Sequence, residues 1–115
     1  FNWNNKLGGI HVALFFDTKI PQYRLEEVYK LTIKINELVW LGHFDIWTNE
    51  LKLLFRYNLL LSGGIMPTNE QCQSLFKHIL DTADKYYPSF QYVIWGGNKA
   101  DEAITNAIFT TIGES

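Results

Sequence analysis

Cysteine is almost absent from this chain, because Cys72 is the only one among 115 residues. A single thiol cannot form an internal disulfide, and it is too few for a zinc site built on cysteines. Cys72 falls within a stripe of apolar residues spaced three and four apart. We therefore expect an inert thiol on the apolar face of a helix, and no catalytic nucleophile.

Runs of basic residues and long apolar runs are also missing. Ten basic residues are scattered among twelve acidic ones, so the formal net charge is −2. Nucleic-acid binding usually needs a concentrated basic patch, and a membrane-spanning helix needs about 18 consecutive apolar residues. No signal peptide is visible at Phe1. The sequence therefore predicts a cytoplasmic protein with neither a nucleic acid nor a membrane as partner.

The patterns that usually carry catalysis or bind cofactors do not occur. No serine lies in a G-x-S-x-G context, and neither glycine-rich nucleotide motif is present. His11, His43 and His78 are not spaced as ligand pairs, and H-E-x-x-H is absent. We therefore expect no catalytic residues, no metal and no cofactor, and we interpret the protein as not an enzyme.

Aromatic and aliphatic residues are plentiful instead. The hydrophobic fraction is 47% and the aromatic fraction 16%, which is typical of one globular domain with a single core. The four tryptophans are expected to be core anchors, with Trp47 the best candidate for an exposed one. In chain order the predicted elements are strands over residues 1–5 and 10–16, a helix over 21–41, strands over 43–47 and 51–61, and helices starting near 68 and 98.

Local signals refine several of these boundaries. Thr68 and Gln71 fit a capping box, and Pro88 either ends that helix or kinks it, with a helix that continues past a kink favoured. Asn98 is the predicted N-cap of the last helix. Strands and helices mix here without strict alternation. The sequence therefore predicts an α+β fold with an antiparallel sheet in one domain, residues 1–115.

Residues 36–47, NELVWLGHFDIW, are unusually dense in rings and charges. We interpret this segment as a joint in which a helix ends, Gly42 reverses the chain, and a strand begins. Strand alternation then places His43, Asp45 and Trp47 together on one face, away from the core. These three residues form the candidate binding surface. A pocket for a small ligand beside them is the alternative, and a His43–Asp45 metal pair is disfavoured.

Three segments together resemble the YbjN-like family of bacterial proteins: NELVWLGHFDIW, FRYNLLLSGG and YYPSFQYVIWGG. The most specific parts are residues 40–47 and 86–91, and the resemblance runs in order over nearly the whole chain. It implies a fold like that of type III secretion chaperones, with a twisted antiparallel sheet flanked by helices. Members usually begin with a further helix and strand, so we expect residues 1–115 to lack them.

The resemblance also implies a role in sensory-transduction regulation and supplies no catalytic residues. The resulting hypothesis is a non-enzymatic, chaperone-like regulatory module that binds a protein partner and forms a homodimer. The alternative is a small-ligand sensor domain with a pocket near Trp47. The identity of the partner does not follow from the sequence.

Overall fold

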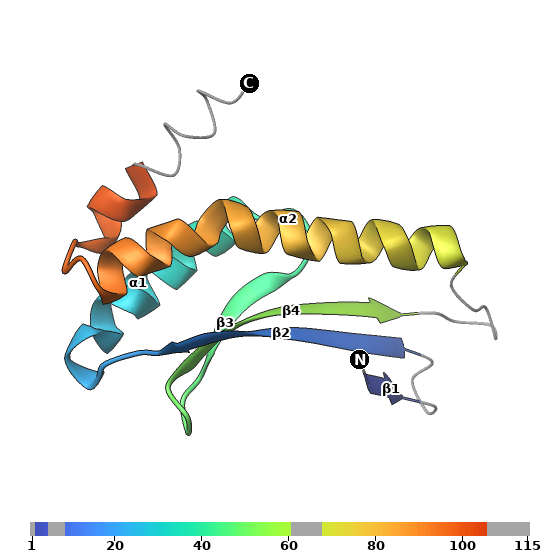
Figure 1. Ribbon diagram of the computed structural model, residues 1–115, viewed down its shortest axis with the longest axis horizontal. Helices are drawn as coiled ribbons and strands as arrows, with labels where there is room; N and C mark the ends of the chain where they lie inside the picture. The colour runs from blue at the N-terminus through green and yellow to red at the C-terminus, as the bar shows by residue number, and fades with distance from the viewer. Residues whose placement is uncertain (1, 5–8, 61–67, 106–115) are drawn as a thin grey trace.

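A computed structural model describes residues 2–4, 9–60 and 68–105, and the side chains of residues 9–59 and 68–105. It has two layers, with a four-stranded antiparallel sheet below and helices on one side of it (Figure 1). The sheet order is β1-β2-β4-β3, which confirms the predicted α+β class. The elements are β1 (Asn2–Asn4), β2 (Gly9–Lys19), α1 (Leu25–Asn36), β3 (His43–Trp47), β4 (Lys52–Leu60) and α2 (Asn69–Ile94).

Strand β2 is longer than the predicted 10–16 because it continues beyond an irregularity in its pairing. Its register with β4 shifts between Phe15 and Lys19. Within this stretch Thr18 is buried, and its hydroxyl is hydrogen-bonded to the hydroxyl of Tyr87 on α2. Alternation along β2 places Thr18 on the same side as Val12 and Phe16, toward the helix layer, where its hydroxyl has a partner. The adjacent glycines Gly8-Gly9 favour a tight turn before β2, but Gly8 lies outside the described part.

Helix α1 is shorter than the predicted 21–41. A short 3-10 helix, Gln22–Arg24, leads into α1, which ends at Asn36. Beyond that point Leu38 and Trp40 are exposed, so the apolar spacing that suggested a longer helix does not reflect a buried face. Gly42 has a φ of +81°, which confirms the predicted reversal of the chain there.

Helix α2 begins and continues as predicted. The hydroxyl of Thr68 accepts a hydrogen bond from the Gln71 N–H at 3.0 Å, and the Gln71 side chain accepts one from the Thr68 N–H at 2.8 Å. Pro88 lies inside the helix, so the predicted continuation beyond this proline is confirmed. Gly97, with a φ of +71°, turns the chain after the helix.

The last helical segment, residues 100–105 of the described part, is not capped by Asn98 as predicted. Its first N–H, that of Ala100, donates to the Glu27 carboxylate of α1 at 2.9 Å. Nearby, the Arg24 guanidinium donates to the carbonyl oxygens of Val93 and Asn98 at 2.8 and 2.5 Å. A cation thus meets the C-terminal end of α2 and an anion meets the start of the next helix. Side chains distant in the sequence therefore bind these helix ends, in place of the local cap by Asn98 that the sequence suggested.

Glu27 makes the stability of this junction depend on pH. The Ala100 N–H, together with Lys30, lowers the pKa of the Glu27 carboxyl below its ordinary value of 4.5. A group whose pKa falls on folding stabilises the protein above its unfolded-state pKa, and that contribution disappears as the pH drops through the folded-state value. We expect Glu27→Gln to flatten the loss of stability between about pH 5 and pH 3, measured by urea unfolding. Identical pH profiles for the two proteins would contradict this assignment.

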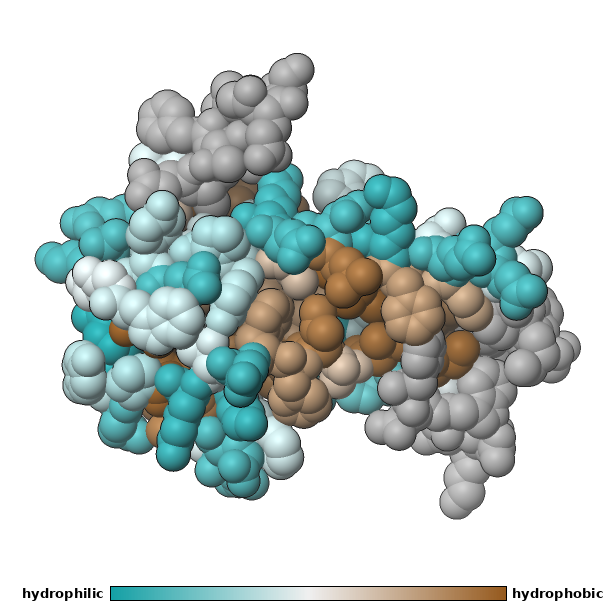
Figure 2. Space-filling model, viewed as in Figure 1, coloured by the Kyte–Doolittle hydropathy of each residue, from teal (hydrophilic) through white to brown (hydrophobic). Residues whose placement is uncertain are grey.

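The core lies between the two layers and is built from aliphatic residues and phenylalanines. Figure 2 shows apolar side chains gathered in a band between α2 and the strands, with hydrophilic ones above it. The largest fully buried side chains are Phe44, Phe55, Phe90, Ile20, Leu31, Ile35, Leu53, Leu54, Val28 and Val93.

The expectation that the tryptophans anchor the core is wrong for Trp40 and Trp95, whereas the predicted exposure of Trp47 is confirmed. Trp40 is 93% exposed, Trp95 64% and Trp47 43%. Trp40 lies in the turn after α1, and Trp95 is the C-cap residue of α2. These turn and helix-end positions place the indoles outside the sandwiched layer, where the smaller phenyl rings pack. The side chain of Trp3 lies outside the described part.

Candidate functional site

The sheet has one face that no described helix covers, which we call the bare face. Both α1 and α2 lie on the opposite side of the sheet (Figure 1). Alternation along β2, β3 and β4 sends Val12, Phe44 and Phe55 into the core between the layers. The residues between them in the strands therefore form the bare face: His11, Ala13, Phe15, His43, Asp45, Trp47, Lys52, Leu54, Arg56 and Asn58.

Two aromatic rings meet on the bare face, toward the end where β3 and β4 form their hairpin. The ring centroids of Phe15 on β2 and Trp47 on β3 are 5.6 Å apart. Because β4 lies between these strands, the two rings reach toward each other across it. Leu54 on β4 pairs with Phe15 in the register and is only 1% exposed, although it points away from the helices. The rings themselves remain 49% and 43% exposed, so they form an apolar patch open to solvent.

Charged side chains flank this patch. Asp45 is half-buried, and its Oδ2 lies 3.2 Å from the Nε of Arg56. Its other carboxylate oxygen accepts a hydrogen bond from the Ile46 N–H at 2.8 Å. His43 is exposed on the same face. The described residues hold no group of three or more His, Cys, Asp or Glu side chains arranged to bind a metal ion.

The outer edge of β3 is closed by side chains. Asn36, the last residue of α1, donates to the Phe44 carbonyl oxygen at 3.0 Å and accepts from the Phe44 N–H at 2.7 Å. The Ile46 N–H is satisfied by Asp45 in the way just described. Exposed edges otherwise invite another strand to pair, and polar caps of this kind discourage such pairing. A partner strand is therefore disfavoured at this edge.

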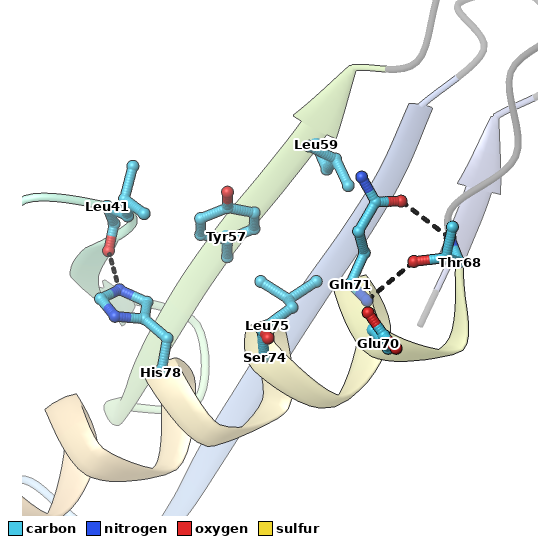
Figure 3. A pocket seen from close by; sticks show the side chains of 9 residues that line it. All are labelled: Leu41, Tyr57, Leu59, Thr68, Glu70, Gln71, Ser74, Leu75 and His78. Atoms are coloured by element: carbon cyan, nitrogen blue, oxygen red, sulfur yellow. Dashed lines mark hydrogen bonds between the residues drawn. The ribbon is translucent and has the colours of Figure 1, made fainter.

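A groove opens on the helix side of the sheet, beyond the end of α1. It has a volume of about 620 Å³ and lies between β4 and the first turns of α2. The Nε2 of His78 on α2 is 3.1 Å from the carbonyl oxygen of Leu41, at one end of the groove (Figure 3). The lining residues are Leu41, Tyr57, Leu59, Thr68, Glu70, Gln71, Ser74, Leu75 and His78.

The sequence grouped His43, Asp45 and Trp47 correctly on one strand face, but none of them lines this groove. Phe15, which completes the apolar patch, was not predicted to be part of this surface. Residues 10–16 are almost all apolar, so their pattern does not distinguish an exposed face of β2 from a buried one. β2 is central, between β1 and β4, yet Phe15 is half exposed.

Asn36 and the groove were also missed. A polar residue at the end of an apolar helical stripe gives no sign that its amide will reach a strand eight residues later. The groove depends on where α1 stops relative to α2, which is a property of packing. The nearest available signal was the run of polar residues at 68–71, which precedes the apolar stripe of α2.

No described helix is both long enough and apolar enough to span a membrane. Comparison with curated proteins and with solved structures gave no significant match. A family model does match residues 1–92, four fifths of the chain, and its description reads "Putative bacterial sensory transduction regulator". The matched region includes all the described strands, α1, and nearly all of α2. This chain therefore belongs to the YbjN family.

Proposed function

We propose that this chain is a non-catalytic, chaperone-like regulatory module that binds a protein partner through the bare face of its sheet. The observation that carries this proposal is the contact between Phe15 and Trp47, two half-exposed rings that together cover a buried leucine. Exposed apolar clusters with polar surroundings are typical of interaction sites.

The composition of the bare face also supports a protein partner. Trp and Arg are enriched among the residues that contribute most to protein–protein binding energy, and both are present here as Trp47 and Arg56. The rings lie on strands of a paired sheet, so little conformational entropy is lost when a partner covers them. The charged residues at the margin are suited to the polar rim of such an interface.

A second copy of the chain is the first partner to test. Two sheets pack face to face when each offers an apolar face, and a two-fold symmetric dimer would place each Trp47 patch against the other copy. The face has an apolar patch and carries both signs of charge, through Asp45, Lys52 and Arg56. Both properties are compatible with self-association, and the homodimer remains part of this proposal.

The small-ligand sensor is the alternative function. The groove beyond α1 is large enough for a small molecule, since ligand pockets commonly measure about 300–1,000 Å³. It lies on the opposite side of the sheet from Trp47, so a ligand there would not contact the predicted surface. We prefer the protein-binding proposal because the bare face presents paired aromatic anchors.

Sedimentation velocity at micromolar concentration tests the proposal, with Trp47→Ala compared against Trp95→Ala. Both variants remove an exposed indole, but Trp95 caps α2 and lies outside the bare face. We expect a wild-type dimer whose dissociation constant rises at least about tenfold in Trp47→Ala and stays unchanged in Trp95→Ala.

Affinity capture from the native bacterial extract completes the test if the wild-type protein is monomeric. Partners retained by the wild type and by Trp95→Ala, but lost by Trp47→Ala, would place the interface on the bare face. The proposal would be contradicted if the wild-type protein is monomeric and if it captures the same partners as both Trp47→Ala and Trp95→Ala.

A further inference from the structure

Strand β4 extends beyond its neighbour β3. His43, the first residue of β3, is paired with Arg56, while β4 continues to Leu60. Over residues 57–60, β4 is bordered on one side by β2. Among the described residues, no strand borders its other side. This short stretch is therefore an open sheet edge in line with β3.

The contacts of Asn36 show which backbone groups face that edge. Because Asn36 binds both the N–H and the carbonyl of Phe44 from outside the sheet, these groups point away from β4. Antiparallel pairing alternates, so Arg56 turns its own N–H and carbonyl toward β3. The position of Gly42 agrees with this orientation, because a Cβ atom added to Gly42 would lie 2.7 Å from the Arg56 carbonyl oxygen. Two residues further on, Asn58 presents its N–H and carbonyl to the same side, beyond the start of β3.

The open edge and the groove lie side by side. Tyr57 and Leu59, the neighbours of Asn58 on β4, both line the groove, as do Leu75 and His78 from α2 (Figure 3). A strand added along this edge would direct alternate side chains to the helix side, into the groove. Glu70 is the acidic residue among those that line it, and it supplies a negative charge near the start of α2.

We propose that the open edge of β4 at Asn58 and the adjoining groove bind an extended peptide segment of a partner protein. The segment adds as a strand antiparallel to β4. Its alternate residues are apolar and occupy the groove, and a basic residue faces Glu70. This mode combines backbone hydrogen bonds with side-chain pockets, as in other cases of strand addition. The site is separate from the bare face, so it goes beyond the function proposed above.

Two features favour this edge and this kind of occupant. The edge of β3 is already closed by Asn36 and Asp45, whereas no described side chain or strand satisfies the Asn58 backbone groups on this side. A bound helix would fill the apolar groove but would leave the Asn58 backbone groups without partners. An extended segment satisfies both the backbone and the groove, and its basic residue complements the charge of Glu70.

Amide hydrogen exchange, followed by NMR on the full chain, tests this proposal with a defined probe. The probe is a short synthetic peptide in which leucine alternates with threonine and which carries one terminal lysine. In the free protein, we expect the Asn58 N–H to exchange much faster than those of Tyr57 and Leu59, which face β2. Adding the peptide should slow exchange at Asn58 and shift the resonances of Leu75 and His78.

Three controls define the mode of binding. A peptide N-methylated at alternate amides keeps its side chains but loses strand hydrogen bonds, and should bind at least about tenfold more weakly. Glu70→Gln should weaken binding by up to about fivefold, as an exposed ion pair would. Trp47→Ala should leave peptide binding unchanged, so failure of the bare-face proposal can be recognised separately.

The proposal is overturned if the peptide does not bind, or if it binds with Asn58 exchange unchanged. It is also overturned if the N-methylated peptide binds equally well, or if the shifts map to the bare face. A helical peptide or a small apolar molecule that competes fully without protecting Asn58 would assign the groove to a different occupant.

Discussion

Replacing Phe44 with alanine is expected to lower the free energy of unfolding by about 3–5 kcal/mol, the usual cost of removing a buried phenyl ring. Phe44 is 1% exposed and lies at the centre of the aromatic core. Its ring centroid is 5.0 Å from that of Phe55 and 5.1 Å from that of Phe90. It also contacts Tyr86 at 6.1 Å and Phe16 at 6.2 Å. The cavity would therefore border both layers, and neither could collapse freely to fill it.

Urea unfolding measures this effect, and Trp40→Ala is the control. Trp40 lies four residues earlier in the same ring-rich segment but is 93% exposed. Truncating it should change the free energy of unfolding by less than about 0.5 kcal/mol, as for other exposed sites. Equal losses in the two variants would mean that Trp40, and not only Phe44, contributes to the core.

Gly42→Ala should lower the free energy of unfolding by about 2–4 kcal/mol for two separate reasons. The φ of +81° at this position costs an L-residue about 1–2 kcal/mol. The added methyl would also lie 2.7 Å from the Arg56 carbonyl oxygen and 2.7 Å from the Cζ of Phe55. Neither atom can move easily, because one is strand backbone and the other belongs to a buried ring, so overpacking adds a further cost.

Gly97→Ala separates these two contributions. Gly97 has a similar φ of +71°, but no atom lies within 4 Å of a Cβ built there. We expect this variant to lose only the conformational part, about 1 kcal/mol. The comparison is made by thermal or urea unfolding of both variants. A smaller loss for Gly42→Ala than for Gly97→Ala would be incompatible with the close approach of the two strands at Gly42.

Much of the fold could be predicted because it follows from patterns among residues that are close in the sequence. Alternation identified β3 and β4, and helical spacing identified α1 and α2. The capping box at Thr68 and the reversal at Gly42 depend on neighbouring residues, so the sequence revealed both. The same alternation placed His43, Asp45 and Trp47 on one face before any tertiary information was used.

The predictions that were wrong concern features that depend on contacts with residues distant in the sequence. Asn36 ends α1 with its amide bound to the edge of β3, and Glu27 caps the last helical segment in place of Asn98. Leu38 follows the apolar spacing of α1, yet the helix has already ended and the side chain is exposed. None of these contacts can be recognised from spacing, because each joins residues from different elements.

The sequence by itself determined the elements, their faces and the membership of a family, since each follows from the periodicity and order of nearby side chains. Tertiary structure alone decided which rings are buried, which sheet edge is closed, and where the groove opens. The physical reason is that burial and edge satisfaction depend on where separate elements end against one another. The short α1 and the late start of β3 leave both the groove and the Asn58 edge uncovered within the described structure.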